Sequence, residues 1–225
     1  MIIACDTSSV ICSVAAADQG LTVFKREAVG GQIHIEKLTP FLKDALAFCN
    51  AQKKPPVALA IAIGPGSFNG LRIGLATMKG LAVALNLPVI PIPSTDAMAF
   101  GLRDKLTGNC RAIIFSHRNF VHFADYTIVA NQSIITPKFS YAPWDELFTT
   151  GIDHFFGNAD RGFGGWLHSE QGSQIESKFH QVEADAAHLA LLAETRMDRA
   201  LMSLDDLEPL YNAKFEAKKW VPPEF

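Results

Sequence analysis

The chain has few cysteines and histidines, and none of them are paired at the spacings that bind metal. The seven histidines include no H-x-x-x-H pair, and the four cysteines include no C-x-x-C pair: Cys5, Cys12, Cys49 and Cys110. Zinc sites and dithiol redox motifs need such close spacings. We therefore expect no metal site and no cofactor of that kind. Buried free thiols fit a reducing compartment, which predicts a cytoplasmic location.

The sequence also lacks a long run of like charges and an uninterrupted apolar segment of transmembrane length. It carries 20 Lys and Arg against 23 Asp and Glu, which gives a net charge of −3. Nucleic-acid binding by a single chain usually needs a basic stripe, so we expect nucleic acid to meet this chain only within a complex. The best candidate span, 57–71, contains Gly-Pro-Gly, and no basic residue before Lys25 supports a signal peptide. These absences predict a soluble protein without a membrane partner.

What the chain does contain is enough apolar sequence for a substantial core, since 48% of its 225 residues are hydrophobic. Short apolar and β-branched runs separated by turn residues predict an antiparallel meander, and alternating helices and strands follow it. The elements expected in the first half are strands at 2–5, 10–15 and 21–26, a helix at 33–49, a strand at 57–63, a helix at 71–85 and a strand at 87–92. Pro40 is expected to bend the first helix.

The second half has a looser copy of this order. Its expected elements are strands at 111–115, 120–128 and 133–137, a short helix at 144–148, a strand at 154–157 and a helix at 184–199. Two tandem β-β-β-α-β-α units are the plan of the actin-like ATPase fold, the ASKHA or RNase H-like class, in which nucleotide lies between the copies. We expect an α/β protein with an N-terminal subdomain at 1–100, which carries the interaction helices, and a divergent C-terminal subdomain at 101–225.

The glycine-rich stretch "IGPGSFNGLRIG" resembles a phosphate loop at first sight. A Walker motif, G-x-x-x-x-G-K-[ST], does not fit, because Gly64 and Gly70 are one residue too far apart and Leu71-Arg72 stand in place of Lys-Ser. The G-x-G-x-x-G fingerprint does not fit either, since Ser67-Phe68-Asn69 separate Gly66 from the next glycine. Without either frame, a plain tight turn is the simpler interpretation.

The helix expected at 71–85 is apolar on two opposite faces. At about 100° per residue, the stripe expected to cover the sheet is Leu71, Leu75, Met78, Ala82 and Leu85. The opposite face consists of Ile73, Ala76, Thr77, Gly80 and Ala84. Small side chains spaced four apart would let another helix approach closely, so this face either packs inside its own domain or binds a partner.

Four segments together resemble the bacterial TsaB (YeaZ) family of the tRNA threonylcarbamoyladenosine pathway. They are "MIIACDTSS", "CSVA", "HIEKLTPFLKDAL" and "AIAIGPGSFNGLRIGLATMKGLAVALNLPVIPIPSTDAMA". The resemblance is strong over about the first hundred residues, and beyond them it rests chiefly on "EADAAHLALLAE" and "LEPLY". It implies a degenerate actin-like protein that forms homodimers or pairs with its paralogue TsaD. TsaD, with TsaB and the ATPase TsaE, transfers the threonylcarbamoyl group to the adenosine next to the anticodon.

The resemblance further implies that the chain is a non-catalytic platform whose first two helices pack on the equivalent helices of TsaD. The partner-binding residues expected on this basis are His34, Glu36, Leu38, Ile73, Ala76, Thr77, Gly80 and Ala84. Three departures from the family pattern stand out: Ile35 follows His34, Asn69 replaces the usual Thr, and 116–118 read Ser-His-Arg instead of Asp-Ala-Arg. The first two departures lie in or beside the expected interface and bear on partner choice.

An active actin-like ATPase or kinase is the main alternative, and a homodimeric paralogue with no role in tRNA modification is another. For the first, the candidates for a remnant phosphate site are Asp6, Thr7, Gly64 and Gly66. Against it, the matching turn of the second half, 114–117, offers no carboxylate to hold a metal ion. The "RGFGGW" segment at 161–166 could hold a base, but a mobile surface loop is the expected interpretation.

Overall fold

The computed structural model describes residues 1–210, apart from 32, 130–131, 134–138, 148–149 and 159–160. Within them the first half folds as a five-stranded sheet flanked by helices. Its elements are β1 (Ile2–Asp6), β2 (Ile11–Asp18), β3 (Leu21–Val29), α1 (Ile33–Ala51), β4 (Ala58–Ala62), α2 (Phe68–Leu85), β5 (Val89–Ile92) and α3 (Ser94–Leu102). The expected strands and the helices α1 and α2 are confirmed, with ends shifted by a few residues, whereas α3 was not expected.

The second half repeats this succession in a six-stranded sheet. Its elements are β6 (Gly108–His117), β7 (Phe120–Val129), β8 (Gln132–Ser133), β9 (Phe139–Pro143), η1 (Trp144–Glu146), β10 (His154–Asn158), α4 (Arg161–Leu167), α5 (Ser173–Glu176), β11 (Phe179–Gln181), α6 (Ala186–Glu194) and η2 (Met197–Arg199). The prediction of a surface loop at 161–166 is wrong, because these residues belong to helix α4. The strand expected at 133–137 and the helix expected at 144–148 lie partly outside the described residues.

The two sheets have the same internal order. The first runs β3-β2-β1-β4-β5, and the second runs β8-β7-β6-β10-β11, with β9 also paired to β7. In each sheet a central strand pairs antiparallel with the next strand of the chain and parallel with a later one. A duplicated 3-2-1-4-5 sheet of this kind is the actin-like ATPase fold, as the sequence predicted.

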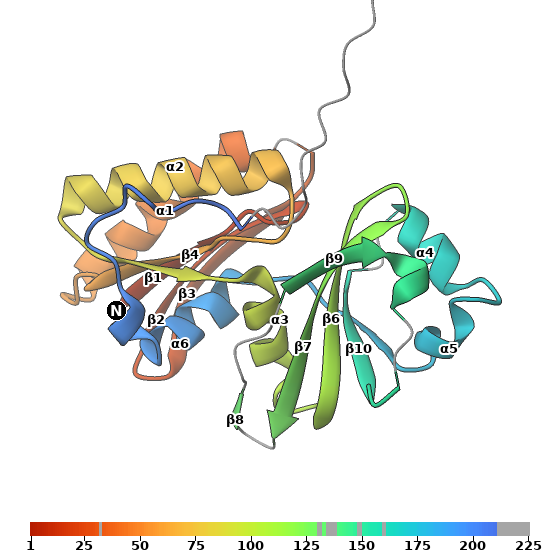
Figure 1. The fold of residues 1–225 in the computed structure, drawn as a ribbon. Helices are drawn as coiled ribbons and strands as arrows, with labels where there is room; N and C mark the ends of the chain where they lie inside the picture. Colours follow the sequence, from red (N-terminus) through yellow and green to blue (C-terminus); the bar gives the residue numbers. More distant parts are fainter. Residues whose placement is uncertain (32, 130–131, 134–138, 148–149, 159–160, 211–225) are drawn as a thin grey trace, which may run out of the picture.

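Successive side chains of a strand point to opposite faces of the first sheet, and each face is covered by its own pair of helices. Ile3 and Cys5 of β1 pack with α1 and α2, whereas Ile2 and Ala4 pack with α3 and α6. Because both faces are covered, the strands are continuously apolar. Figure 1 shows α1 and α2 together on the outer side of the first sheet, and α3 and α6 toward the second half.

Helix α6 belongs to the second half of the sequence but packs on the first sheet, where it contacts β1 and β2. Its first turn is tied there, since the Ala186 amide donates to the Ser13 hydroxyl (3.1 Å) and Lys25 pairs with Asp185 (2.7 Å). The division of the chain near residue 100 stays a prediction. One hydrophobic core, shared by both sheets and these inner helices, lies between the halves.

A buried polar cluster also joins the halves. The Tyr126 hydroxyl of β7 donates to Asp96 Oδ1 of α3 (2.8 Å) and lies 2.7 Å from Thr95 Oγ1. Arg196, just after α6, pairs with the other oxygen of Asp96 (2.6 Å), and Asp96 is only 1% exposed. Polar groups buried in this way are stable because each has a partner.

Candidate protein interface

The turn after β1 and the glycine loop before α2 pack directly against each other. The Ser67 amide donates to the Ser8 carbonyl oxygen (2.7 Å), and the Thr7 hydroxyl donates to the Gly70 carbonyl oxygen (2.8 Å). A Cβ atom on Gly66 would collide with the Ser8 carbonyl, and one on Gly70 would collide with the Thr7 carbonyl. This close approach of two backbones requires glycine at both positions and explains them without a bound phosphate.

Asp6 lies fully buried at the base of this contact. The Ser8 amide and hydroxyl both donate to its carboxylate, at 2.8 and 2.9 Å. Burial raises the pKa of Asp6 to about 6, against the lowering effect of the two hydrogen bonds. A carboxylate enclosed in this way and held by its own turn does not face a solvent-borne metal ion.

The structure thus brings together the residues predicted as a remnant phosphate site, namely Asp6, Thr7, Gly64 and Gly66. The carbonyl oxygen of Gly64 accepts from the Ser94 amide (2.8 Å), so the loop is held from the β5 side as well. The segment after η2 closes the same end of the sheet, because Leu210 donates its amide to the Ile63 carbonyl oxygen (2.7 Å). A phosphate-binding role for these residues stays a prediction.

Two of the residues expected to bind a partner lie inside the molecule, and the expectation needs correction for them. Leu38 is 1% exposed and packs in the core beneath α1. His34 is buried, and its Nε2 donates to the Ser9 carbonyl oxygen (2.9 Å), which fixes the start of α1 to the turn after β1. Glu36, one turn from the start of α1, is exposed as expected.

On α2 the two faces separate largely as the sequence predicted. Leu71, Leu75, Met78 and Ala82 are buried, although Leu85 is 40% exposed. On the opposite face Ala76, Gly80 and Ala84 are exposed and Ile73 and Thr77 are half-buried. A Cβ atom on Gly80 would meet nothing within 4 Å in the part of the chain that the structure describes. This face is therefore open to a partner.

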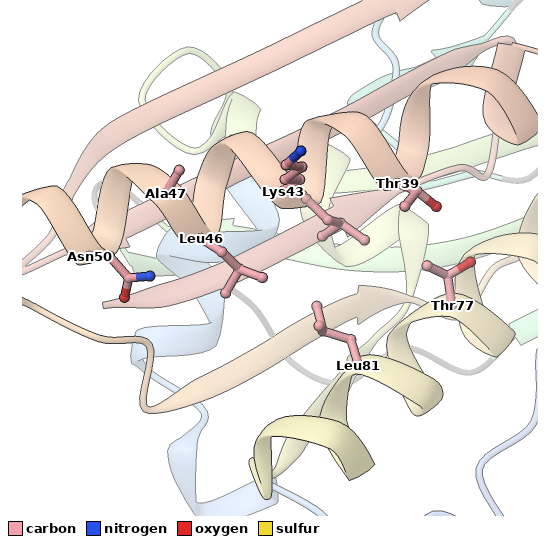
Figure 2. Close-up of a pocket in the computed structure, with 8 residues that line it drawn as sticks. Thr39, Lys43, Leu46, Ala47, Asn50, Thr77 and Leu81 are labelled. Atoms are coloured by element: carbon pink, nitrogen blue, oxygen red, sulfur yellow. The ribbon is translucent and has the colours of Figure 1, made fainter.

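A shallow groove runs between this face and α1. It has a volume of about 500 Å³ and is lined by Thr39, Leu42, Lys43, Leu46, Ala47 and Asn50 of α1 and by Thr77 and Leu81 of α2. Figure 2 shows Leu46 and Leu81 pointing into the space between the two helices. The α1 side of the groove was missed from the sequence. A signal existed, because Thr39, Lys43, Leu46 and Asn50 recur at three- and four-residue spacing on one side of α1.

We call the α1 and α2 residues that line this groove, together with Ile73, Ala76, Gly80 and Ala84, the outer helix surface. Large apolar side chains extend it: Ile35 (68% exposed), Phe68 (52%) and Val83 (77%). The Arg72 guanidinium lies over the Phe68 ring, 3.9 Å from its centroid. An apolar surface with a few charges and an open groove is typical of a protein–protein interface.

The described residues include no group of three His, Cys, Asp or Glu side chains placed to hold a metal ion. No helix among them has the length and apolar character needed to span a membrane.

The duplicated sheet defines the class: an actin-like ATPase fold. The family described as "TsaD: tRNA N6-adenosine threonylcarbamoyltransferase" matches residues 28–138. The tRNA threonylcarbamoyladenosine biosynthesis protein TsaB of Haemophilus influenzae is 32% identical over 154 residues, which cover 67% of this chain and 63% of the relative. The TsaB protein of Escherichia coli is 35% identical over 127 residues, 56% of this chain and 54% of the relative.

Among solved structures, YeaZ from Pseudomonas aeruginosa has a TM-score of 0.76 at 23% identity and covers 93% of this chain and 98% of its own. This likeness confirms the fold. Together these similarities support the TsaB (YeaZ) family for this chain. The aligned region spans between about half and two thirds of the length of these two curated relatives.

Proposed function

We propose that this chain is a non-catalytic subunit of the machinery that makes tRNA threonylcarbamoyladenosine, and that it supports the TsaD transferase in the cytoplasm. It does so by pairing with TsaD through the outer helix surface, and TsaE and tRNA join within the complex. The observation that carries this proposal is the open apolar face of α2, with Gly80 unobstructed, beside the groove along α1.

Family relationship supports the partner, since relatives of this chain carry the name of that biosynthetic pathway. Geometry supports the mode of pairing, because Ala76, Gly80 and Ala84 have no long side chains to hold a second helix away. Two such faces are self-complementary, so the same surface also fits a homodimer. The homodimer and the TsaD heterodimer would then compete for it.

The test places an arginine at Gly80. A charge in a desolvated helix interface stays unpaired, which costs several kcal/mol, so Gly80→Arg should weaken pairing more than about a hundredfold. Gly165→Arg is the matched control, because Gly165 also lies in a helix, is exposed and has open space at its Cβ position. Light scattering measures self-association, and co-purification with tagged TsaD measures the heterodimer.

Pairing that survives Gly80→Arg in both measurements would reject the outer helix surface. Loss of self-association with retained TsaD binding would favour a second surface for TsaD. Loss of both with Gly165→Arg unaffected is the expected result.

The rival activity, ATP hydrolysis by the chain alone, has a separate test. Buried Asp6 with its carboxylate held by Ser8 argues against turnover. Steady-state hydrolysis that disappears in Asp6→Asn would overturn the non-catalytic assignment.

A further inference from the structure

A cluster of aromatic rings lies at one end of the second sheet, away from the outer helix surface. It consists of His117, Phe120, His122 and Tyr141, from the β6–β7 hairpin and from β9. His122 stands directly opposite Tyr141 in the β7–β9 register. Phe120 and His122 lie on the face of β7 that further along contributes Ala124 and Tyr126 to the core between the halves.

Three rings of the cluster stack on one another with lateral offsets. The centroids of His117, Phe120 and Tyr141 are 5.1 to 6.4 Å from one another, and their planes differ by only 17 to 27°. Such distances between nearly parallel rings are typical of offset stacking, so a further ring can extend the stack at its exposed side. His117 is exposed and Phe120 and Tyr141 are partly exposed.

Polar groups lie beside the stacked rings. The His117 Nδ1 atom lies within reach of two hydroxyls, Ser116 Oγ (3.1 Å) and Tyr141 Oη (3.4 Å). When either hydroxyl donates to Nδ1, the ring proton is on Nε2, which then is a donor toward solvent. His122 is 8% exposed, and its Nδ1 has no hydrogen-bond partner in the described part of the chain.

The charge of the cluster suits an anionic aromatic ligand. Arg118 is exposed at the tip of the hairpin, in a left-handed backbone conformation, and forms no ion pair with another described residue. Burial and the neighbouring His117 lower the pKa of His122 to about 4, so its imidazole is neutral near pH 7.

We propose that His117, Phe120, His122 and Tyr141 form a stacking platform for an unpaired nucleobase, with Arg118 at the adjoining phosphate. Aromatic side chains on a sheet surface bind exposed bases in this way, with little sequence preference. A single platform of this size gives weak binding, which agrees with a net charge of −3. The base can come from a single-stranded RNA segment or from a free nucleotide.

The test uses the full chain without any partner, so its failure leaves the proposed pairing with TsaD untouched. Fluorescence anisotropy follows a labelled seven-nucleotide single-stranded RNA and the same RNA paired to its complement. We expect the single strand to bind at least about tenfold more tightly, because duplex bases are already stacked. Titration with AMP and with inorganic phosphate, followed by NMR of the histidine rings, separates a free nucleotide from an RNA base.

The variants His117→Ala and Tyr141→Leu should each weaken single-strand binding by about tenfold. Phe24→Leu is the control, because the Phe24 ring pairs with Phe48 in the first half (5.5 Å) and lies outside the cluster. His117 is exposed, so its variant keeps the fold even if Tyr141→Leu lowers stability. Equal binding of single strand and duplex, no binding of RNA or AMP by the native chain, or unchanged affinity in His117→Ala would each overturn the platform.

Discussion

The two halves share one strand order but cover the outer faces of their sheets in different ways. In the first half α1 and α2, of 19 and 18 residues, lie side by side over the sheet. At the corresponding points of the second half stand η1, of 3 residues, and α4, of 7. There, large side chains such as Trp144, Phe163 and Trp166 pack together over the outer face. Among the residues that the structure describes, a broad helical surface is therefore found in the first half and not in the second.

The largest predicted loss of stability comes from a substitution on the side of α2 that faces the sheet. Leu75 is 6% exposed in the core of the first half, and Leu75→Glu would bury an unpaired charge. We expect a loss of about 3–5 kcal/mol, which is a large part of the roughly 5–15 kcal/mol by which a typical domain is stable. Ala76→Glu, one residue away on the exposed face, should change stability by less than about 1 kcal/mol. Urea unfolding followed by circular dichroism measures both, and equal losses would show that α2 is buried all round.

Next in size is a difference in how the halves respond to pH. Burial raises the pKa of Asp6 from 3.8 to about 6, so between about pH 4 and 6 the folded chain holds the extra proton. The free energy of unfolding then falls as pH rises, by up to about 3 kcal/mol. His122 does the opposite: its pKa falls from 6.5 to about 4, the unfolded chain holds the extra proton, and stability rises with pH. In the native chain the two effects largely cancel.

Single variants should separate the pH dependence of stability that Asp6 contributes from that of His122. Asp6→Asn leaves the His122 effect alone, so stability should rise from about pH 4 to 6.5. His122→Leu leaves the Asp6 effect, so stability should fall over about pH 4 to 6. Denaturant unfolding across this range measures both curves. Parallel pH curves for the two variants would contradict the opposite assignments.

The smallest expected effects distinguish two glycines of α2, one closely packed and one with open space beside it. A Cβ atom on Gly70 would collide with the Thr7 carbonyl, so Gly70→Ala should destabilise the chain by about 1–3 kcal/mol. Gly80 has open space, and Gly80→Ala should stabilise the isolated chain by up to about 1 kcal/mol through helix propensity. Thermal unfolding compares them. Similar shifts of the same sign would mean that the turn after β1 moves to make room.

The sequence predicted the longer helices and the strands of the first half, and failed for two short helices, α3 and α4. Helix α1 was found because its buried residues recur at helical spacing. Helix α3 was missed, since nearly every residue from Ser94 to Leu102 is buried and no polar face marks its period. Helix α4 was taken for a loop because of its glycines, yet Phe163 and Trp166 pack into the core of the second half and override that propensity.

The candidate site was predictable only in part. The small residues on one face of α2 identified its open side, and the spacing of Leu38 with Leu42 and Cys49 indicated that Leu38 faces the core. The burial of His34 depends on a contact distant in sequence, the bond to the Ser9 carbonyl oxygen, which no local pattern showed. The extent of α6 was also misjudged: Asp185 caps it by accepting from the Ala187 amide (2.8 Å), so the helix begins just after that residue.

The polar cluster of Asp96, Tyr126 and Arg196 has a mechanical consequence. A two-lobed protein that closes on a ligand needs a hinge whose opening and closing cost little. Here, swinging the lobes apart would pull Tyr126 from Asp96 and strain the Asp96–Arg196 pair, in surroundings where an unpaired charge costs several kcal/mol. We expect the two lobes to move as one stiff body, so that any partner seated on α1 and α2 is held at a constant angle to the second lobe.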